Sequence, residues 1–98
     1  LNNGFKSLRF DVFPNPSMDL IAIQANGIVK EKILVELFSS TGQLVRNTEI
    51  TPGRTIAYFD VQTLHQGAYG VRVSCGENIK NFKVMRQPGF NSLSFKRG

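Results

Sequence analysis

The segment at positions 64–69, Leu-His-Gln-Gly-Ala-Tyr, constrains the fold more than any other part of this chain. Apolar residues alternate with other residues from Tyr69 through Val71 to Val73, so a strand follows directly. A Leu-x-x-Gly-x-Tyr sequence before a strand is typical of the tyrosine corner. In that motif the tyrosine hydroxyl bonds to the backbone a few residues upstream and fixes a strand crossing. Leu64, Gly67 and Tyr69 therefore predict a Greek-key sandwich.

Seven short stretches carry the apolar and β-branched residues of strands, and turn signals separate them. These stretches are 8–12, 20–25, 33–38, 44–48, 55–61, 69–73 and 79–84. Since no stretch has helical periodicity, the sequence predicts an all-β domain, a seven-stranded antiparallel Greek-key sandwich of Ig-like or fibronectin-like type. We expect residues 1–7 to form a linker and 8–86 the sandwich. Residues 87–98 form a tail that could be an added edge strand, a partner-binding segment or a segment foreign to the domain.

Basic residues gather at the C-terminal end of the chain. Residues 1–78 hold seven basic and seven acidic residues, whereas 79–98 hold five basic residues and no acidic one. The whole net charge of +5 therefore lies in the last strand and the tail. Such a cluster suits an acidic partner or an anionic surface. Lysines on a solvated edge strand also discourage aggregation, which is the alternative interpretation.

The residues needed for catalysis or for a bound metal are missing. His65 is the only histidine and Cys75 the only cysteine, so the usual four-ligand zinc site cannot be built from them. The acidic residues stand singly, without calcium-loop spacing, and the turn glycines form no phosphate-binding cluster. Aromatic residues at inward strand positions favour core packing over base stacking. The sequence therefore predicts no enzyme, no cofactor, no metal and no nucleic-acid partner.

Four motifs, in order, resemble the C-terminal sorting domains of the type IX secretion system. The segment at 12–17, Val-Phe-Pro-Asn-Pro-Ser, resembles that family's opening Tyr/Phe-Pro-Asn-Pro-Ser motif. The segment at 35–45 resembles its Asp-x-x-Gly-x-Leu-Val hairpin, with a serine at 39 or 40 in place of the Asp. The segment at 64–73 resembles its Leu-x-x-Gly-x-Tyr-x-x-x-Val block, and 80–84 its final basic and apolar strand. The residues that carry the resemblance are Pro14, Asn15, Pro16, Gly42, Leu64, Gly67 and Tyr69.

The resemblance implies a non-catalytic targeting module fused to the C-terminal side of a cargo protein. Such domains fold in the periplasm of a Gram-negative bacterium and are recognised by the outer-membrane translocon and its shuttle proteins. A sortase then removes them near their N-terminal linker, and the cargo is anchored at the cell surface or released. By this resemblance we expect the translocon to recognise Lys80, Phe82, Lys83 and Arg86. The expected processing region contains Asn3, Gly4 and Ser7.

Other functions are compatible with the same fold class, because sandwiches host many unrelated activities. The main alternative is an Ig-like adhesion or carbohydrate-binding module of a surface protein, which would use exposed loop aromatics such as Phe13, Tyr58 and Phe90. A structural spacer inside a hydrolase is a third interpretation. An exposed last strand would also allow self-association by edge-to-edge pairing.

Overall fold

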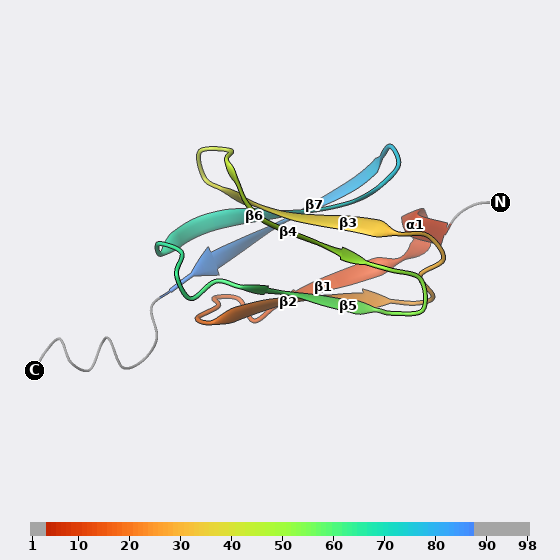
Figure 1. The fold of residues 1–98 in the computed structure, drawn as a ribbon, viewed down its shortest axis with the longest axis horizontal. Helices are drawn as coiled ribbons and strands as arrows, with labels where there is room; N and C mark the ends of the chain where they lie inside the picture. The colour runs from red at the N-terminus through yellow and green to blue at the C-terminus, as the bar shows by residue number, and fades with distance from the viewer. Residues whose placement is uncertain (1–3, 88–98) are drawn as a thin grey trace, which may run out of the picture.

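The computed structural model describes residues 4–87, which form two antiparallel sheets packed face to face (Figure 1). One sheet has the strand order β1-β2-β5 and the other β4-β3-β6-β7. The strands are β1 (Arg9–Phe13), β2 (Leu20–Asn26), β3 (Ile33–Ser39), β4 (Leu44–Ile50), β5 (Ile56–Asp60), β6 (Gly67–Cys75) and β7 (Asn78–Arg86). The predicted all-β class, with seven strands in antiparallel sheets, is therefore confirmed for these residues.

The core lies between the two sheets, where alternate side chains of each strand point inward. Val35 and Leu37 in β3 and Val73 in β6 are fully buried, as their alternation predicts. β2 is the central strand of its sheet, which agrees with its apolar residues on both faces. Full burial of one such aliphatic side chain contributes about 1.5–3 kcal/mol, so this layer is the main source of stability.

The tyrosine corner is present and connects the two sheets. The Tyr69 hydroxyl donates a hydrogen bond to the carbonyl oxygen of His65 at 2.6 Å, and the Leu64 N–H donates to the Val61 carbonyl at 3.1 Å. Gly67 has a φ of +143°, a conformation that glycine adopts without strain. The corner thus carries the chain from β5 in one sheet to β6 in the other, as the sequence predicts.

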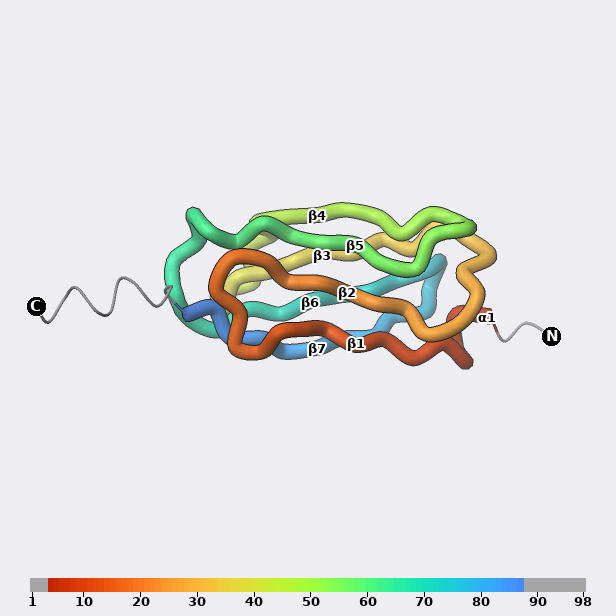
Figure 2. Tube along the Cα trace, turned by 90° about the horizontal axis from the view of Figure 1, so that it is seen from below, coloured from red at the N-terminus to blue at the C-terminus, as the bar shows by residue number. Residues whose placement is uncertain are grey.

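Two strands lie on each long side of the sandwich. β1 and β7 run along one side, and β4 and β5 along the other (Figure 2). β7 pairs with β6 alone among the described strands and is therefore an edge strand. The chain segment between β1 and β2 lies beside the C-terminal end of β7, where Ser17 and Arg86 form an isolated parallel bridge.

Part of the predicted N-terminal linker packs against the sandwich. Residues Gly4–Ser7 form a short helix, α1, and the Phe5 ring packs against the Phe10 ring with centroids 5.6 Å apart. In residues 2–7 Phe5 is the one apolar residue apart from the glycine, so the sequence pattern gives no sign of this attachment. Residues 1–3 and the tail from residue 88 lie outside the described residues. Over residues 4–87, no helix has the length and apolar character needed to cross a membrane.

Candidate functional site

The strand expected to carry the recognition signal, β7, presents its side chains alternately to the two faces of its sheet. Lys80, Phe82 and Arg86 point toward the interior and are half-buried or buried. Lys83 points to the outer surface and is exposed. The structure therefore does not bring the three basic residues onto one surface, because a strand reverses its side chains at every residue.

Arg86 fastens the end of β7 to the connection between β5 and β6. The side chain is only 9% exposed. Its Nε donates to the Val61 carbonyl oxygen at 2.8 Å, its Nη2 to the Gln62 carbonyl oxygen at 2.9 Å, and its Nη1 to the Gln87 carbonyl oxygen. A guanidinium has five donors in a fixed geometry, so three backbone acceptors suit it well. The positive charge of Arg86 is thus enclosed by the fold.

Lys80 fastens the other half of β7 to the N-terminal segment. Its Nζ donates to the Leu8 carbonyl oxygen at 2.5 Å and to the Lys6 carbonyl oxygen at 3.4 Å. The same ammonium lies 5.2 Å from the ring centroid of Phe5 and 5.5 Å from that of Phe10, within cation–π distance. Lys80 therefore joins the expected recognition strand to the segment that contains two of the expected processing residues, Gly4 and Ser7. The third, Asn3, lies outside the described residues.

Lys83 is the basic residue of β7 that remains available at the surface. It is opposite Gly70 of β6, beside an open depression whose lining includes Ser39, Ala68 and Asn81. The ion pairs among residues 4–87 are Lys32 with Glu49 and Arg72 with Glu36, and neither involves β7. An uncompensated, solvated ammonium beside a hollow is suited to contact an acidic group.

The loop at residues 14–17, called here the Pro-Asn-Pro-Ser loop, pairs with the free edge of β7. The Met85 N–H donates to Asn15 Oδ1 at 2.9 Å, and Asn15 Nδ2 donates to the Lys83 carbonyl oxygen at 3.4 Å. The Ser17 N–H donates to the Met85 carbonyl oxygen at 2.8 Å, and the Gln87 N–H to the Ser17 carbonyl oxygen at 2.8 Å. Both prolines follow cis peptide bonds. The turn signals in the sequence predict a connection between the strands here, but they give no sign of its pairing with β7.

These bonds divide the edge of β7 into two parts. In an antiparallel ladder, alternate residues direct both backbone groups toward the same neighbour. Since Met85 directs its N–H and C=O away from β6, Asn81 and Ile79 do the same. Within residues 4–87 no partner bonds to the backbone groups of Ile79 and Asn81 on that side. We call residues 79–82 the open segment and residues 83–87 the capped segment.

A model of the secretion system C-terminal sorting domain matches residues 11–87. The match contains the Pro-Asn-Pro-Ser loop, the tyrosine corner and the whole of β7. The chain belongs to this family. It is a C-terminal sorting signal for type IX secretion, which leads to the cell surface or to release. Domains of this family are in general non-catalytic. No curated protein matches the chain.

The hairpin of the sorting domain between β3 and β4 shows which serine takes the place of the motif's Asp. Ser39 Oγ accepts hydrogen bonds from the N–H groups of Thr41 at 3.3 Å and Gln43 at 3.2 Å. This is the local bonding by which Asp or Ser stabilises a turn. Gly42 follows with a φ of +88°, which explains a glycine at this position of the motif.

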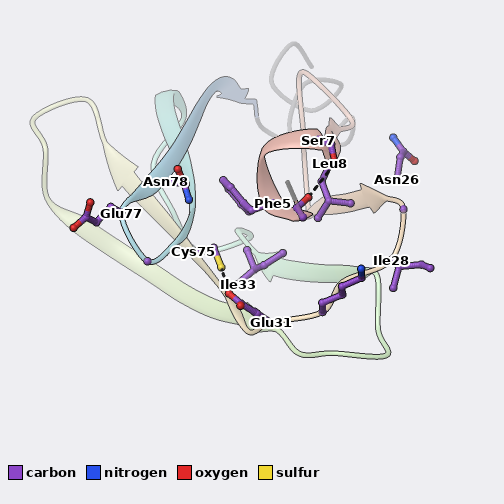
Figure 3. Close-up of a pocket in the computed structure, with 14 residues that line it drawn as sticks. Phe5, Ser7, Leu8, Asn26, Ile28, Glu31, Ile33, Cys75, Glu77 and Asn78 are labelled. Carbon is purple, nitrogen blue, oxygen red and sulfur yellow. Dashed lines mark hydrogen bonds between the residues drawn. The ribbon is translucent and has the colours of Figure 1, made fainter. Parts of the chain in front are cut away.

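A cleft of about 1070 Å³ lies at the α1 end of the sorting domain (Figure 3). α1, the segment after β2 and the turn between β6 and β7 line it. In this cleft the half-buried Cys75 donates a hydrogen bond from Sγ to Glu31 Oε1 at 3.3 Å. Burial, that hydrogen bond and the negative charge of Glu31 all raise the pKa of the Cys75 thiol. The thiol therefore stays protonated and weakly nucleophilic, in keeping with a structural cysteine.

Two of the three aromatic residues expected of an adhesion module, Phe13 and Tyr58, lie on strands rather than in loops. Phe13 in β1 and Tyr58 in β5 are both opposite Ala22 of β2, and they are 44% and 56% exposed. Phe90 lies outside the described residues. His65 is exposed, and within residues 4–87 no group of three or more His, Cys, Asp and Glu side chains could hold a metal ion.

Proposed function

We propose that the type IX translocon recognises this sorting domain through β7, with Lys83 as the basic residue that contacts it. Lys80, Phe82 and Arg86 contribute by holding the strand in position. The observation that carries this proposal is the exposure of Lys83 on an edge strand whose other two basic side chains are engaged by backbone carbonyls. A fixed strand with one solvated cation can meet an acidic surface without prior rearrangement.

The proposed partners are the outer-membrane translocon, its shuttle proteins and a sortase, which the domain meets after folding in the periplasm. Processing takes place in the segment that contains Asn3, Gly4 and Ser7. α1 and the C-terminal end of β7 lie at opposite ends of the sandwich (Figure 1). Because Lys83 points to the outer face of β7 and Lys80 holds the N-terminal segment on the inner face, a translocon on Lys83 would leave this segment accessible to the sortase.

The proposed fold type is the Greek-key sandwich of the Ig-like or fibronectin-like class. Its support is the path of the chain, which leaves β4 for β5 in the other sheet and returns to β6 beside β3. Such a connection between non-consecutive antiparallel neighbours is the feature that defines a Greek key. The tyrosine corner at Tyr69 is a further hallmark of these sandwiches.

The test is the export of a fluorescent protein fused to residues 1–98, in a type IX-competent host and in the same host without the translocon. We expect translocon-dependent export of the parent fusion and a strong loss on Lys83→Glu. Lys30→Glu makes the same charge change at an exposed lysine outside β7 and is expected to leave export unchanged. Equal export of the two variants would contradict the proposed role of Lys83, and export without the translocon would contradict the route.

A further inference from the structure

The open segment of β7 has the geometry of a strand acceptor. Its outward backbone groups, the N–H and C=O of Ile79 and Asn81, have no partner among residues 4–87. β6 holds the same strand in an unbroken antiparallel register on the other side, from Gly67 opposite Arg86 to Cys75 opposite Asn78. A row of unpaired groups on a well-ordered strand is a template for an added strand.

The Pro-Asn-Pro-Ser loop sets one limit of that template. Asn15 and Ser17 already bond to the outward groups of Met85 and to the Lys83 carbonyl oxygen. An added strand that extended beyond Lys83 would have to break these hydrogen bonds. It would also have to displace Ser17, which is fully buried. The acceptor therefore ends at Lys83, and its length suits a short pairing of about four residues.

Charge identifies the kind of strand that fits. Lys83 lies on the outer face at the limit of the open segment, and β7 contains no acidic residue. A second copy of this chain would bring another Lys83 and no acidic side chain of β7 to the same edge, which opposes pairing between copies. An incoming strand with an acidic side chain would instead satisfy both the backbone groups and Lys83.

Building on the proposed function, we infer that the open segment of β7 accepts an extended, acidic strand of the secretion machinery by β-strand addition. The backbone of Ile79 and Asn81 supplies the hydrogen bonds, and Lys83 selects for the acidic side chain. Recognition would thus depend on the main chain as well as on charge.

The experiment compares Asn81→Pro with Asn81→Ala in the same fluorescent fusion. Because the Asn81 N–H points away from β6, proline at this edge position removes no ladder bond, and edge strands tolerate it. Proline abolishes the donor and places its ring where the added strand would lie, whereas alanine removes the side chain alone. We expect export of Asn81→Pro to be at least about tenfold lower than that of Asn81→Ala, which corresponds to roughly 1.4 kcal/mol.

Thermal unfolding of both purified variants checks that they are folded. If Asn81→Pro does not fold, Ile79→Pro decides in its place, since the N–H of Ile79 also faces the edge. Export of the folded proline variant at the level of Asn81→Ala would overturn strand addition. If Lys83→Glu were still defective in that case, the proposed function would stand and recognition would use side chains alone. Parent export that did not depend on the translocon would contradict the proposed function itself.

Discussion

The two halves of β7 differ in whether the backbone groups at the free edge of the strand are hydrogen-bonded within residues 4–87. In the capped segment the outward backbone groups are bonded to the Pro-Asn-Pro-Ser loop, and the inward Arg86 is enclosed by backbone carbonyls. In the open segment the outward groups have no partner among residues 4–87, and the inward Lys80 bonds to the carbonyl oxygens of Lys6 and Leu8 in the N-terminal segment. Folded proteins usually cover or charge an edge strand along its length. Here one strand is held firmly at one end and left available at the other.

The largest test of this contrast removes the anchor of the capped segment. Arg86→Met keeps the apolar stem but leaves the Val61 and Gln62 carbonyl oxygens without their charged donor. A hydrogen bond to a charged group contributes about 1.5–3 kcal/mol, and a buried acceptor left unpaired is costly, so we expect a loss of about 3 kcal/mol in the free energy of unfolding. Urea denaturation of Arg86→Met and of the parent measures this loss.

Arg86→Lys is the matched control for that variant. It keeps the positive charge but lacks the planar fork that reaches several carbonyls at once. We expect its free energy of unfolding to lie between those of the parent and of Arg86→Met. Parent-like stability of Arg86→Met would show that the capped segment is held by the Pro-Asn-Pro-Ser loop alone.

A smaller effect is expected when the open segment loses its link to the N-terminal segment. Lys80→Met removes the donor to the Leu8 carbonyl oxygen and the ammonium near the rings of Phe5 and Phe10. The loss should be about 1–2 kcal/mol. Limited proteolysis should show faster cleavage within residues 4–8, because this segment then loses the hydrogen bonds from Lys80 Nζ to the Lys6 and Leu8 carbonyl oxygens.

Lys83→Met removes a lysine of the same strand that has no such contacts and is the control for Lys80→Met. Its stability and its cleavage should stay close to those of the parent, within about 0.5 kcal/mol. Equal cleavage of the two variants would mean that Lys80 does not hold the N-terminal segment.

The Pro-Asn-Pro-Ser loop offers a third test with an effect of about 1 kcal/mol. Asn15→Ala removes the acceptor of the Met85 N–H and the donor to the Lys83 carbonyl oxygen. We expect faster hydrogen exchange at the Met85 amide. The capped segment would then exchange more like the open segment. Asn15→Asp keeps the acceptor oxygen, so the Met85 amide should remain protected. Fast exchange in both variants would show that the Asn15 side chain does not protect this edge.

Much of this fold could be predicted because it follows from local patterns. Alternating residues such as Val71 and Val73 specify a strand and its buried face, and the spacing of Leu64, Gly67 and Tyr69 specifies the corner. The family could also be predicted, because its motifs lie in these same local segments. The positions of the strands and the family match agree with those expectations.

The details of the site could not be predicted, because they depend on contacts between distant residues. Asn15 and Met85 are seventy positions apart, and nothing in the sequence of the loop shows that it lies along the last strand. The sequence gives Lys80, Lys83 and Arg86 the same charge, yet their places in the alternation and their distant carbonyl partners give them different environments. A cluster of charge in a sequence therefore need not be a cluster on a surface.

The smallest expected effect concerns Gly70, which is opposite Lys83 at the boundary between the two segments. Its φ lies outside the left-handed region, and the nearest atom to an added Cβ would be the Phe82 carbonyl oxygen at 3.9 Å, an ordinary contact. Glycine inside a strand is less stable than alanine by roughly 0.5–1 kcal/mol, so Gly70→Ala should raise the free energy of unfolding by about that amount.

Gly27→Ala provides the contrast for that variant. Gly27 has a φ of +141°, and a Cβ there would lie 2.7 Å from Leu8 Cδ2, so we expect destabilisation. Urea denaturation of both variants shows whether the free energy of unfolding rises or falls. Hydrogen exchange shows which amides of β7 are affected. If Gly70→Ala stabilises the domain while the open segment still exchanges faster than the capped one, the difference between the two halves comes from the edge partners. If the difference in exchange between the two segments disappears in Gly70→Ala, it comes from weak pairing of β6 with β7 at Gly70. The Pro-Asn-Pro-Ser loop is then not its cause.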